Sequence, residues 1–321
     1  MKYFLFFLFP TLLLSQNNIL SAEQNLFAMF YNVENLFDTI NNPFKNDDEF
    51  TPDSKKQWNS ERYSHKINKL EQVFMSINNG LMPNIIGLSE VENKVVIEDL
   101  LKAPFFKDHN YTIIHQESPD QRGIDCAVLF DSQFELLKYD FIGINNPESS
   151  RPTRDIVYVK LKFKTEVFHV FVNHWPSRWG GAEKTNHKRV FAAKVLKKYI
   201  NRNLKVDDNI VIMGDFNDYP SNESVRDVLV ENDFVNMMSS NMVRGLGSYN
   251  YKGEWNFIDH VIVSNSLKNR VFSSGAFSKD WMLYINDQGE KYPSRTYGGS
   301  NWYGGFSDHL PVYCRIRILP N

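Results

Sequence analysis

Residues 210–218 of this 321-residue chain read IVIMGDFND, four apolar side chains followed at once by glycine and a polar stretch. A short apolar run that ends at a turn residue is typical of a buried strand. Asp215 and Asn217 then come directly after the strand. Strand ends are where α/β proteins assemble sites, because a rigid sheet fixes groups from distant parts of the chain. The stretch therefore predicts a sheet with a functional edge.

The same arrangement, an apolar strand followed by a polar residue, recurs along the chain. The further polar residues at such positions are Asn32, Glu90, His174, Asp259, Asp308 and His309. A single aspartate after a strand is usually a turn residue or a helix cap. The functional interpretation therefore depends on the whole set.

Strand and helix patterns alternate throughout, which favours an α/β fold over repeats or linked modules. We expect strands at 26–32, 85–88, 111–115, 126–130, 156–163, 167–173, 210–213, 257–263 and 310–318, and helices at 60–78, 95–101 and 184–200. The long stretch 278–306 is rich in Gly, Tyr and Trp, and a loop of that length in a compact domain is usually functional.

Composition limits the class of protein. Hydrophobic residues make up 42% of the chain and aromatic residues 14%, which argues against a disordered or fibrous protein. The 36 basic residues nearly balance 38 acidic ones, giving a net charge of -2. No global positive field attracts a polyanion, so nucleic acid binding would need a local basic groove or a metal.

The N-terminus resembles a secretion signal. Lys2 precedes the apolar run 3–14, which is too short to span a bilayer but suits a signal peptide. Ser15 and Ala22 offer two cleavage points, so we predict a signal peptide at 1–22, cleaved after residue 15 or 22. The mature chain, 23–321, is expected to be one domain, exported to the periplasm or secreted, without a stable membrane span. The alternative is an N-terminal core strand.

Cys126 and Cys314 both lie in apolar strand-like runs. Buried, unpaired thiols that act as small hydrophobes are the default interpretation. A disulfide stays open for an exported protein, because sequence alone does not place the two Cα atoms within reach.

Six short motifs occur in order along the chain: NVENLF (32–37), LSEVE (88–92), NHWPS (173–177), GDFND (214–218), FIDHV (257–261) and SDHLPV (307–312). Together they resemble the endonuclease/exonuclease/phosphatase superfamily. The resemblance implies an α/β four-layer sandwich, with two packed mixed β-sheets flanked by helices as in deoxyribonuclease I. One site that draws on both ends of the chain also implies one domain.

Hydrolysis of a phosphate ester needs an activated water, neutralised phosphoryl charge and a stabilised leaving oxygen. Asn32, Glu90 and Asp308 form a hard-oxygen set suited to Mg²⁺ or Mn²⁺. No cysteine or histidine spacing indicates zinc. We therefore expect a Mg²⁺ or Mn²⁺ cofactor.

The acid–base groups are expected among the remaining motif residues. Asp215 could orient or deprotonate the attacking water, with Asn217 donating a hydrogen bond to water or phosphate; the resemblance implies the same roles. Asp259 would fix the tautomer of His309 and favour its protonated form. His174 is expected to donate to a phosphoryl or leaving oxygen.

Arginines supply further positive charge. Arg122 and Arg154 precede strands and could each form a bidentate contact to phosphate, with a surface or structural ion pair as the alternative for each. Arg178 and Arg295, on presumed site loops, are weaker candidates, and Arg178 completes the expected substrate-binding set.

The resemblance fixes the reaction type better than the substrate. Aromatic residues follow the histidine motif and precede the last motif: Trp175, Trp179, Trp281, Tyr297, Trp302, Tyr303 and Phe306. They could stack on nucleobases, enter a lipid interface, or pack the loops together. We expect a monomeric secreted endonuclease or related phosphodiesterase acting on a phosphate ester, which could be nucleic acid. The alternatives are a secreted phosphatase or phospholipid phosphodiesterase and, more remotely, a non-catalytic binding module.

Overall fold

The computed structural model of the protein describes residues 25–242 and 247–319. The expected signal peptide, 1–22, lies outside the described residues. Within them, no helix is both long and apolar enough to cross a membrane.

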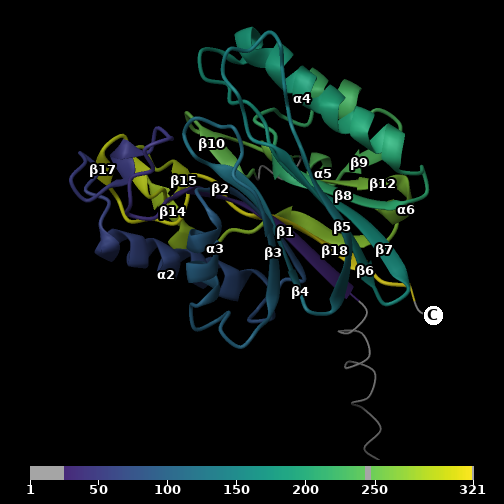
Figure 1. The fold of residues 1–321 in the computed structure, drawn as a ribbon, viewed down its shortest axis with the longest axis horizontal. Helices are drawn as coiled ribbons and strands as arrows, with labels where there is room; N and C mark the ends of the chain where they lie inside the picture. Colours follow the sequence, from purple (N-terminus) through teal and green to yellow (C-terminus); the bar gives the residue numbers. More distant parts are fainter. Residues whose placement is uncertain (1–24, 243–246, 320–321) are drawn as a thin grey trace, which may run out of the picture.

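Two mixed sheets dominate the fold (Figure 1). Within the described ranges, each of these sheets has six strands. The first sheet runs in the order β13 (Val271–Ala276), β18 (Val312–Arg317), β1 (Asn25–Leu36), β2 (Ile85–Val91), β4 (Asp125–Asp131) and β3 (Tyr111–His115). The second runs β5 (Phe134–Ile142), β6 (Ile156–Phe163), β7 (Glu166–His174), β8 (Asn209–Asp215), β12 (Asp259–Ser264) and β9 (Phe234–Asn236).

Short elements lie between the longer strands and helices of the described chain. Three small hairpins pair β10 (Tyr249–Tyr251) with β11 (Glu254–Asn256), β14 (Leu283–Ile285) with β15 (Lys291–Pro293), and β16 (Tyr297–Gly298) with β17 (Asn301–Trp302). The single-turn helices are η1 (Asp48–Phe50), α5 (Ser239–Met242), α6 (Asn265–Lys268) and η3 (Asp280–Met282).

Strand β1 illustrates how the sequence builds layers. It is apolar on both faces, as expected for a strand in the middle of a covered sheet. Ala28 and Phe30 pack into the core between the two sheets, whereas Phe27 and Met29 pack toward the outer helices. The chain therefore buries both faces of this strand.

The longer helices cover the outer faces. Helices α2 (Ser60–Ile77) and α3 (Lys94–Leu101) pack on the first sheet, and α4 (Ala182–Asn203) with the π-helix η2 (Ser224–Val230) packs on the second (Figure 1). Asn59 and Asn93 cap α2 and α3, each accepting a hydrogen bond from a backbone N–H in the first turn. This is the four-layer sandwich that the resemblance implies.

The two sheets approach closely at Gly87 in β2. A Cβ atom there would lie only 2.7 Å from Cγ2 of Val172 in β7. The position therefore needs glycine because the sheets pack on each other at that point.

The prediction of the α/β sandwich is confirmed, and most expected elements are present. Among the longer elements, the sequence patterns did not indicate β5, β13 and η2, and they also did not indicate β9, the short hairpins or the single-turn helices. Cys126 and Cys314 are buried in the core between the sheets as free thiols, so the default interpretation of the two cysteines is confirmed. Burial raises the pKa of the Cys314 thiol to about 12.

Candidate active site

The candidate site lies where strands of both sheets end. Asn32 and Glu90 come from β1 and β2 of the first sheet, and His309 lies just before β18. In the second sheet, Asp215 on β8 is opposite His174 on the parallel strand β7 and opposite Asp259 on the antiparallel strand β12. The adjacent strands of each sheet thus bring residues far apart in sequence to one edge.

Glu90 owes its position to an irregularity in the sheet. The register of β2 with β4 shifts between Ser89 and Val91, and Glu90 has a φ of 61°. A left-handed residue in a bulge turns its side chain away from the regular alternation. One carboxylate oxygen of Glu90, Oε2, accepts a 3.0 Å hydrogen bond from the backbone N–H of Asn35, which has a φ of 51°. Backbone strain is therefore concentrated beside the site.

Asn32 occupies the centre of the cluster and is 1% exposed. Its amide nitrogen lies 3.3 Å from Glu90 Oε1, 3.1 Å from Asp215 Oδ2 and 3.5 Å from His309 Nε2. A single side chain thus contacts residues from both sheets.

Asp215 is buried between two histidines. Its Oδ2 lies 3.5 Å from His174 Nε2 and 3.8 Å from His309 Nε2, and its Oδ1 accepts from the backbone N–H of Asn217 at 2.9 Å. Burial, followed by the charge of Asp259, raises the pKa of Asp215 to about 7. A carboxylate with a pKa near neutrality can exchange a proton with water at physiological pH.

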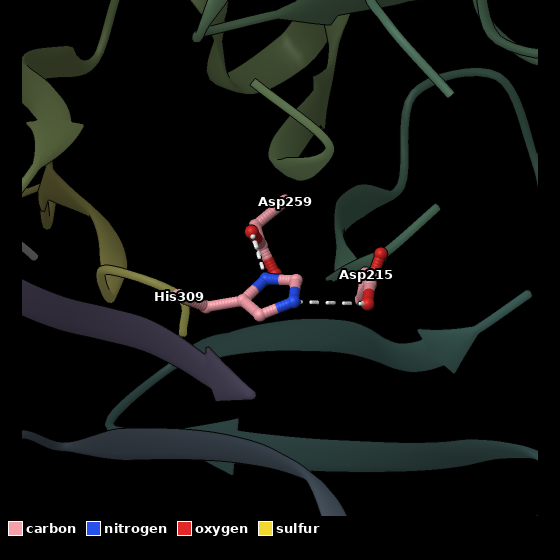
Figure 2. A group of neighbouring side chains, drawn as sticks. All are labelled: Asp215, Asp259 and His309. Carbon is pink, nitrogen blue, oxygen red and sulfur yellow. Dashed lines mark hydrogen bonds and ion pairs between the residues drawn. The ribbon is translucent and has the colours of Figure 1, made fainter. Parts of the chain in front are cut away.

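His309 is held by Asp259 through a 2.8 Å contact from Nδ1 to Oδ2 (Figure 2). Burial lowers the pKa of His309, but the charge and hydrogen bond of Asp259 and the charges of Asp215 and Asp308 outweigh it. The pKa of His309 is therefore raised well above its usual value. The ring of Tyr249 lies 5.1 Å from the imidazole, centroid to centroid.

His174 has the opposite electrostatic environment. Burial and then the charges of Arg154 and Arg122 lower its pKa well below the usual value. Its Nε2 lies 3.9 Å from Glu90 Oε1, and its Nδ1 is buried without a hydrogen-bond partner among the described residues. The site thus contains one imidazole that favours the charged form and one that favours the neutral form.

The donor set fits a hard divalent cation. In the described part of the chain, neither Glu90 nor Asp215 has a lysine or arginine within ion-pair distance. Carboxylate oxygens without such a partner are suited to Mg²⁺ or Mn²⁺. The amide oxygen of Asn32 accepts from the backbone N–H of Glu34 at 3.0 Å, and its amide nitrogen faces the carboxylates. Asp215, Asp259 and His309 also present ligand atoms within 4.8 Å of one another, but Asp259 and His309 already bind each other. We therefore regard the oxygens around Glu90 as the better ligand set.

Asp308 lies at the outer side of the cluster. Its Oδ1 is 3.9 Å from His309 Nε2, and its Oδ2 accepts from Arg295 Nη2 at 3.1 Å. Arg295 also pairs with Glu34 at 3.5 Å. This chain of charges links Asp308 to a buried carboxylate on β1.

The expected substrate residues separate into two groups. Arg154 is buried, pairs with Asp120 at 3.2 Å and donates to the Trp175 carbonyl at 3.0 Å, where the side chain of Asn217 also donates at 3.1 Å. Arg122 is half-exposed and lies 3.6 Å from the same Asp120 carboxylate. Both arginines adjoin the site.

Arg178 is placed differently. Its guanidinium donates to Asp218 at 3.2 Å and to Asn222 at 2.8 Å, and it stacks 4.0 Å from the centroid of the Tyr219 ring. Arg189 binds the same Asp218 carboxylate at 2.8 Å. The side chain of Arg178 therefore belongs to this ion-pair network, and the structure does not bring it to the cluster around Asn32.

Several residues near the cluster carried no clear signal in the sequence. Tyr249 comes from a hairpin that matches none of the motifs, and Lys66 on α2 is fully buried and donates to Thr296 and to the Phe306 carbonyl, both at 2.6 Å. Burial lowers the pKa of Lys66 to about 8. The motif residue Glu34 accepts from the backbone N–H of Thr296 at 2.6 Å, which makes it a supporting residue for the last loop.

Comparisons with solved structures agree with the fold. A humanized D. rerio TDP2 aligns with a TM-score of 0.58 and 13% identity, covering 91% of this chain and 99% of that one. An endonuclease/exonuclease/phosphatase family protein from Bacteroides thetaiotaomicron gives 0.58 and 14%, covering 92% and 99%. The mannosyl-6-phosphatase Bt3783 of the same species gives 0.55 and 14%, covering 90% and 98%. At these identities the similarity establishes the fold alone.

Comparison of the sequence with curated proteins gave no significant match. The model of one protein family, described as the Endonuclease/Exonuclease/phosphatase family, matches residues 27–318 and therefore nearly all of the described chain. The chain belongs to the endonuclease/exonuclease/phosphatase family, a family of metal-dependent phosphoesterases.

Proposed function

We propose that the protein is a secreted endonuclease or related phosphodiesterase that hydrolyses a phosphate ester with an activated water and Mg²⁺ or Mn²⁺. The observation that supports this most strongly is the cluster itself: Asn32 contacts Glu90, Asp215 and His309 within 3.5 Å. A hard-oxygen group, a carboxylate with a pKa near 7 and an imidazole that favours the protonated form therefore converge on one point.

Asp215 is the proposed base. Its buried carboxylate takes a proton from the attacking water, which its pKa of about 7 permits near neutral pH. The backbone N–H of Asn217 donates to Oδ1 and holds the carboxylate in orientation. The turn after β8 therefore contains Asn217 and also fixes the orientation of the Asp215 carboxylate.

His309 and His174 are the proposed donors. His309, kept charged by Asp259, donates from Nε2 to a phosphoryl oxygen and offsets the charge that develops there. His174 favours the neutral form and donates one ring N–H to a phosphoryl or leaving oxygen. Arg154 and Arg122 add positive charge behind the phosphate.

A cation held by Glu90, Asn32 and Asp308 would polarise the phosphoryl oxygens and neutralise their charge. The Asn35 backbone N–H fixes Glu90 for this task, and Arg295 fixes Asp308. Both carboxylates are therefore oriented by other parts of the chain.

Two observations support a diester with an extended group on the phosphate. A structure of D. rerio TDP2, similar to this chain in fold, contains a single-stranded DNA product. Trp179, 81% exposed, and Tyr303, 63% exposed, lie on the two loops that follow His174 and precede Asp308. Exposed rings can stack on bases. By contrast, Trp175, Tyr297 and Phe306 are buried and pack the loops together.

The proposal includes export of a mature, monomeric, single-domain chain that begins after residue 15 or 22. It is motivated by the apolar run 3–14 behind Lys2. Mass spectrometry of the protein from its native source should find an N-terminus near Gln16 or Glu23. Native protein that begins at Met1 would contradict export.

A substrate panel tests the activity. Plasmid DNA, single-stranded DNA, RNA, inositol phosphates, a sugar phosphate and sphingomyelin vesicles should each be incubated with Mg²⁺, with Mn²⁺ and with EDTA. We expect metal-dependent cleavage of a nucleic acid. Preferential hydrolysis of a phosphomonoester would indicate a phosphatase instead of a nuclease. Preferential hydrolysis of the vesicles would indicate a phospholipid phosphodiesterase. Full activity in excess EDTA would refute the requirement for a divalent metal.

A further inference from the structure

A cavity of about 420 Å³ adjoins the candidate active site. It lies between the loop that contains Asn46, the loop 120–122, the loop 144–154 and the segment from Pro176 to the first turns of α4. The charged residues among its described lining are Asp120, Arg122, Arg151, Arg154 and Lys188. None of these five charged residues belongs to the six sequence motifs.

The lining is strongly positive. Among the described residues that line the cavity, only Asp120 is acidic, and its carboxylate is already bound by Arg154 at 3.2 Å and approached by Arg122 at 3.6 Å. Arg151 is exposed and Lys188 is half-buried, and in the described chain neither forms an ion pair with a carboxylate. The cavity therefore has cationic groups in excess of its own counter-charge.

Buried polar atoms in the lining also lack partners. Thr153 Oγ1 and Arg154 Nε are buried and form no hydrogen bond with the described residues. Buried donors of this kind are normally satisfied in native proteins, by protein, water or a ligand. Thr153 and Arg154 both belong to the lining, so the wall of the cavity contains polar groups that the described residues leave unsatisfied.

The cavity is connected to the catalytic cluster through Arg154. Its Nη2 donates to the Trp175 carbonyl, which also accepts from the side chain of Asn217, and the Trp175 N–H donates to the backbone oxygen of Asp215. The charges of Arg154 and Arg122 also reach His174, where they act after burial to lower its pKa. The cavity and the cluster are therefore neighbours, with Arg154 belonging to the lining of the first and acting on His174 in the second.

We propose that this cavity is a subsite for a second anionic group of the substrate, a phosphate neighbouring the one that is cleaved. Arg151 and Lys188 contact that group, and the exposed ring of Trp179 at the lining packs against the part of the substrate between the two phosphates. The inference rests on the proposed function and adds to it a preference for substrates with at least two phosphates.

Direct binding tests the subsite without turnover. The double variant Arg151→Gln/Lys188→Gln is compared with Lys194→Gln/Lys198→Gln, whose lysines lie on α4 beside a different hollow. Calorimetry with inorganic tripolyphosphate, in EDTA and at low salt, should give wild-type affinity for the control. The first variant should bind about tenfold more weakly or worse, as expected when charged hydrogen bonds are lost.

A kinetic comparison tests the substrate preference. The KM of a dinucleotide with a 5′-phosphate should rise in Arg151→Gln/Lys188→Gln about tenfold more than the KM of bis-p-nitrophenyl phosphate, which has one phosphate. Equal tripolyphosphate binding by the two double variants, or equal rises in both KM values, would overturn the subsite. If the wild type bound tripolyphosphate but hydrolysed no phosphate ester, the result would instead contradict the proposed function and leave the subsite standing.

Discussion

Asp215 and Asp259 lie directly opposite each other on the antiparallel strands β8 and β12, and the imidazole of His309 lies between their carboxylates (Figure 2). Nδ1 of His309 is 2.8 Å from Asp259, and Nε2 is 3.8 Å from Asp215. The register of β8 with β12 therefore sets the distance between Asp215, the proposed base, and the Asp259–His309 pair. The imidazole of that pair is the proposed charged donor. Substitutions at these positions should affect chemistry more than folding.

Asp215→Asn and His309→Ala should each reduce kcat/KM by about 100-fold or more, because each removes a positioned acid–base group. Hydrolysis of bis-p-nitrophenyl phosphate with Mg²⁺ or Mn²⁺ measures the loss, and circular dichroism checks the fold. The exposed Asp227→Asn is the matched control. Near-wild-type rates in correctly folded variants would refute the assigned roles.

Asp259→Asn should produce a milder loss than His309→Ala, because the imidazole is retained but loses the carboxylate that holds its tautomer and charge. The same diester assay, repeated with Asp259→Asn, gives the comparison. A larger loss than in His309→Ala would indicate that Asp259 acts in another way, such as binding a metal.

Glu90→Gln should raise the metal concentration needed for half-maximal activity by about 10-fold or more. The amide keeps one oxygen but removes the negative charge that a hard cation requires. Titration of Mg²⁺ and Mn²⁺ into metal-depleted protein, followed by activity and by calorimetry, checks this. Glu98→Gln, at an exposed carboxylate on α3, should match the wild type. Unchanged metal binding in Glu90→Gln would exclude Glu90 as a ligand.

Arg154→Gln and Arg178→Gln should have different effects although both arginines were expected to bind substrate. Arg154→Gln should raise KM about tenfold or more, because it removes positive charge beside the site. It should also lower the melting temperature, because it removes the ion pair with the buried Asp120. Arg178→Gln should mainly lower the melting temperature, since it leaves the buried Asp218 with fewer partners. A large KM change in Arg178→Gln at normal stability would instead support the prediction from the sequence that Arg178 binds substrate.

His260 should make stability depend on pH. Burial lowers its pKa to about 4, and it accepts a hydrogen bond from Asn236 at Nδ1 while Nε2 donates to the Asp218 carbonyl. Between its folded pKa of about 4 and the unfolded value near 6.5, the unfolded chain binds more protons. The contribution is complete above pH 6.5 and falls by about 3 kcal/mol as the pH drops toward 4.

Chemical denaturation of the wild type and of His260→Gln at several pH values between 4 and 7 measures this contribution. The difference in unfolding free energy between the two proteins should shrink as the pH falls. A difference that stays constant with pH would contradict the assignment to His260.

Local pattern predicted most of the longer strands and helices and the candidate residues at the strand ends, whereas the two-sheet sandwich was implied by the resemblance to the family. Apolar runs ending in polar residues mark buried strands and their ends, as at Asp215. Strand β5 was missed because it lies at a sheet edge and carries charged side chains, including Glu135 and Lys138, on an exposed face. Edge strands of this kind lack the apolar signal.

Side-chain direction could not be predicted in the same way. Arg178 follows His174 by four residues, yet its guanidinium turns to Asp218. The bulge that orients Glu90 has no marker in the sequence, since a left-handed glutamate is uncommon. Tyr249 reaches His309 only because a distant hairpin folds against the site. These relationships depend on tertiary packing.

The division of the cluster between two sheets has a further consequence. Asn32 and Glu90 belong to the first sheet, whereas His174 and Asp215 belong to the second. A cation and a phosphate that bind together would cross-link the two halves of the sandwich, and ligands that bind only the folded state stabilise it by mass action. At about 100 times the dissociation constant the gain is about 2.7 kcal/mol. Resistance to unfolding in this protein should therefore rise and fall with the supply of metal and phosphate.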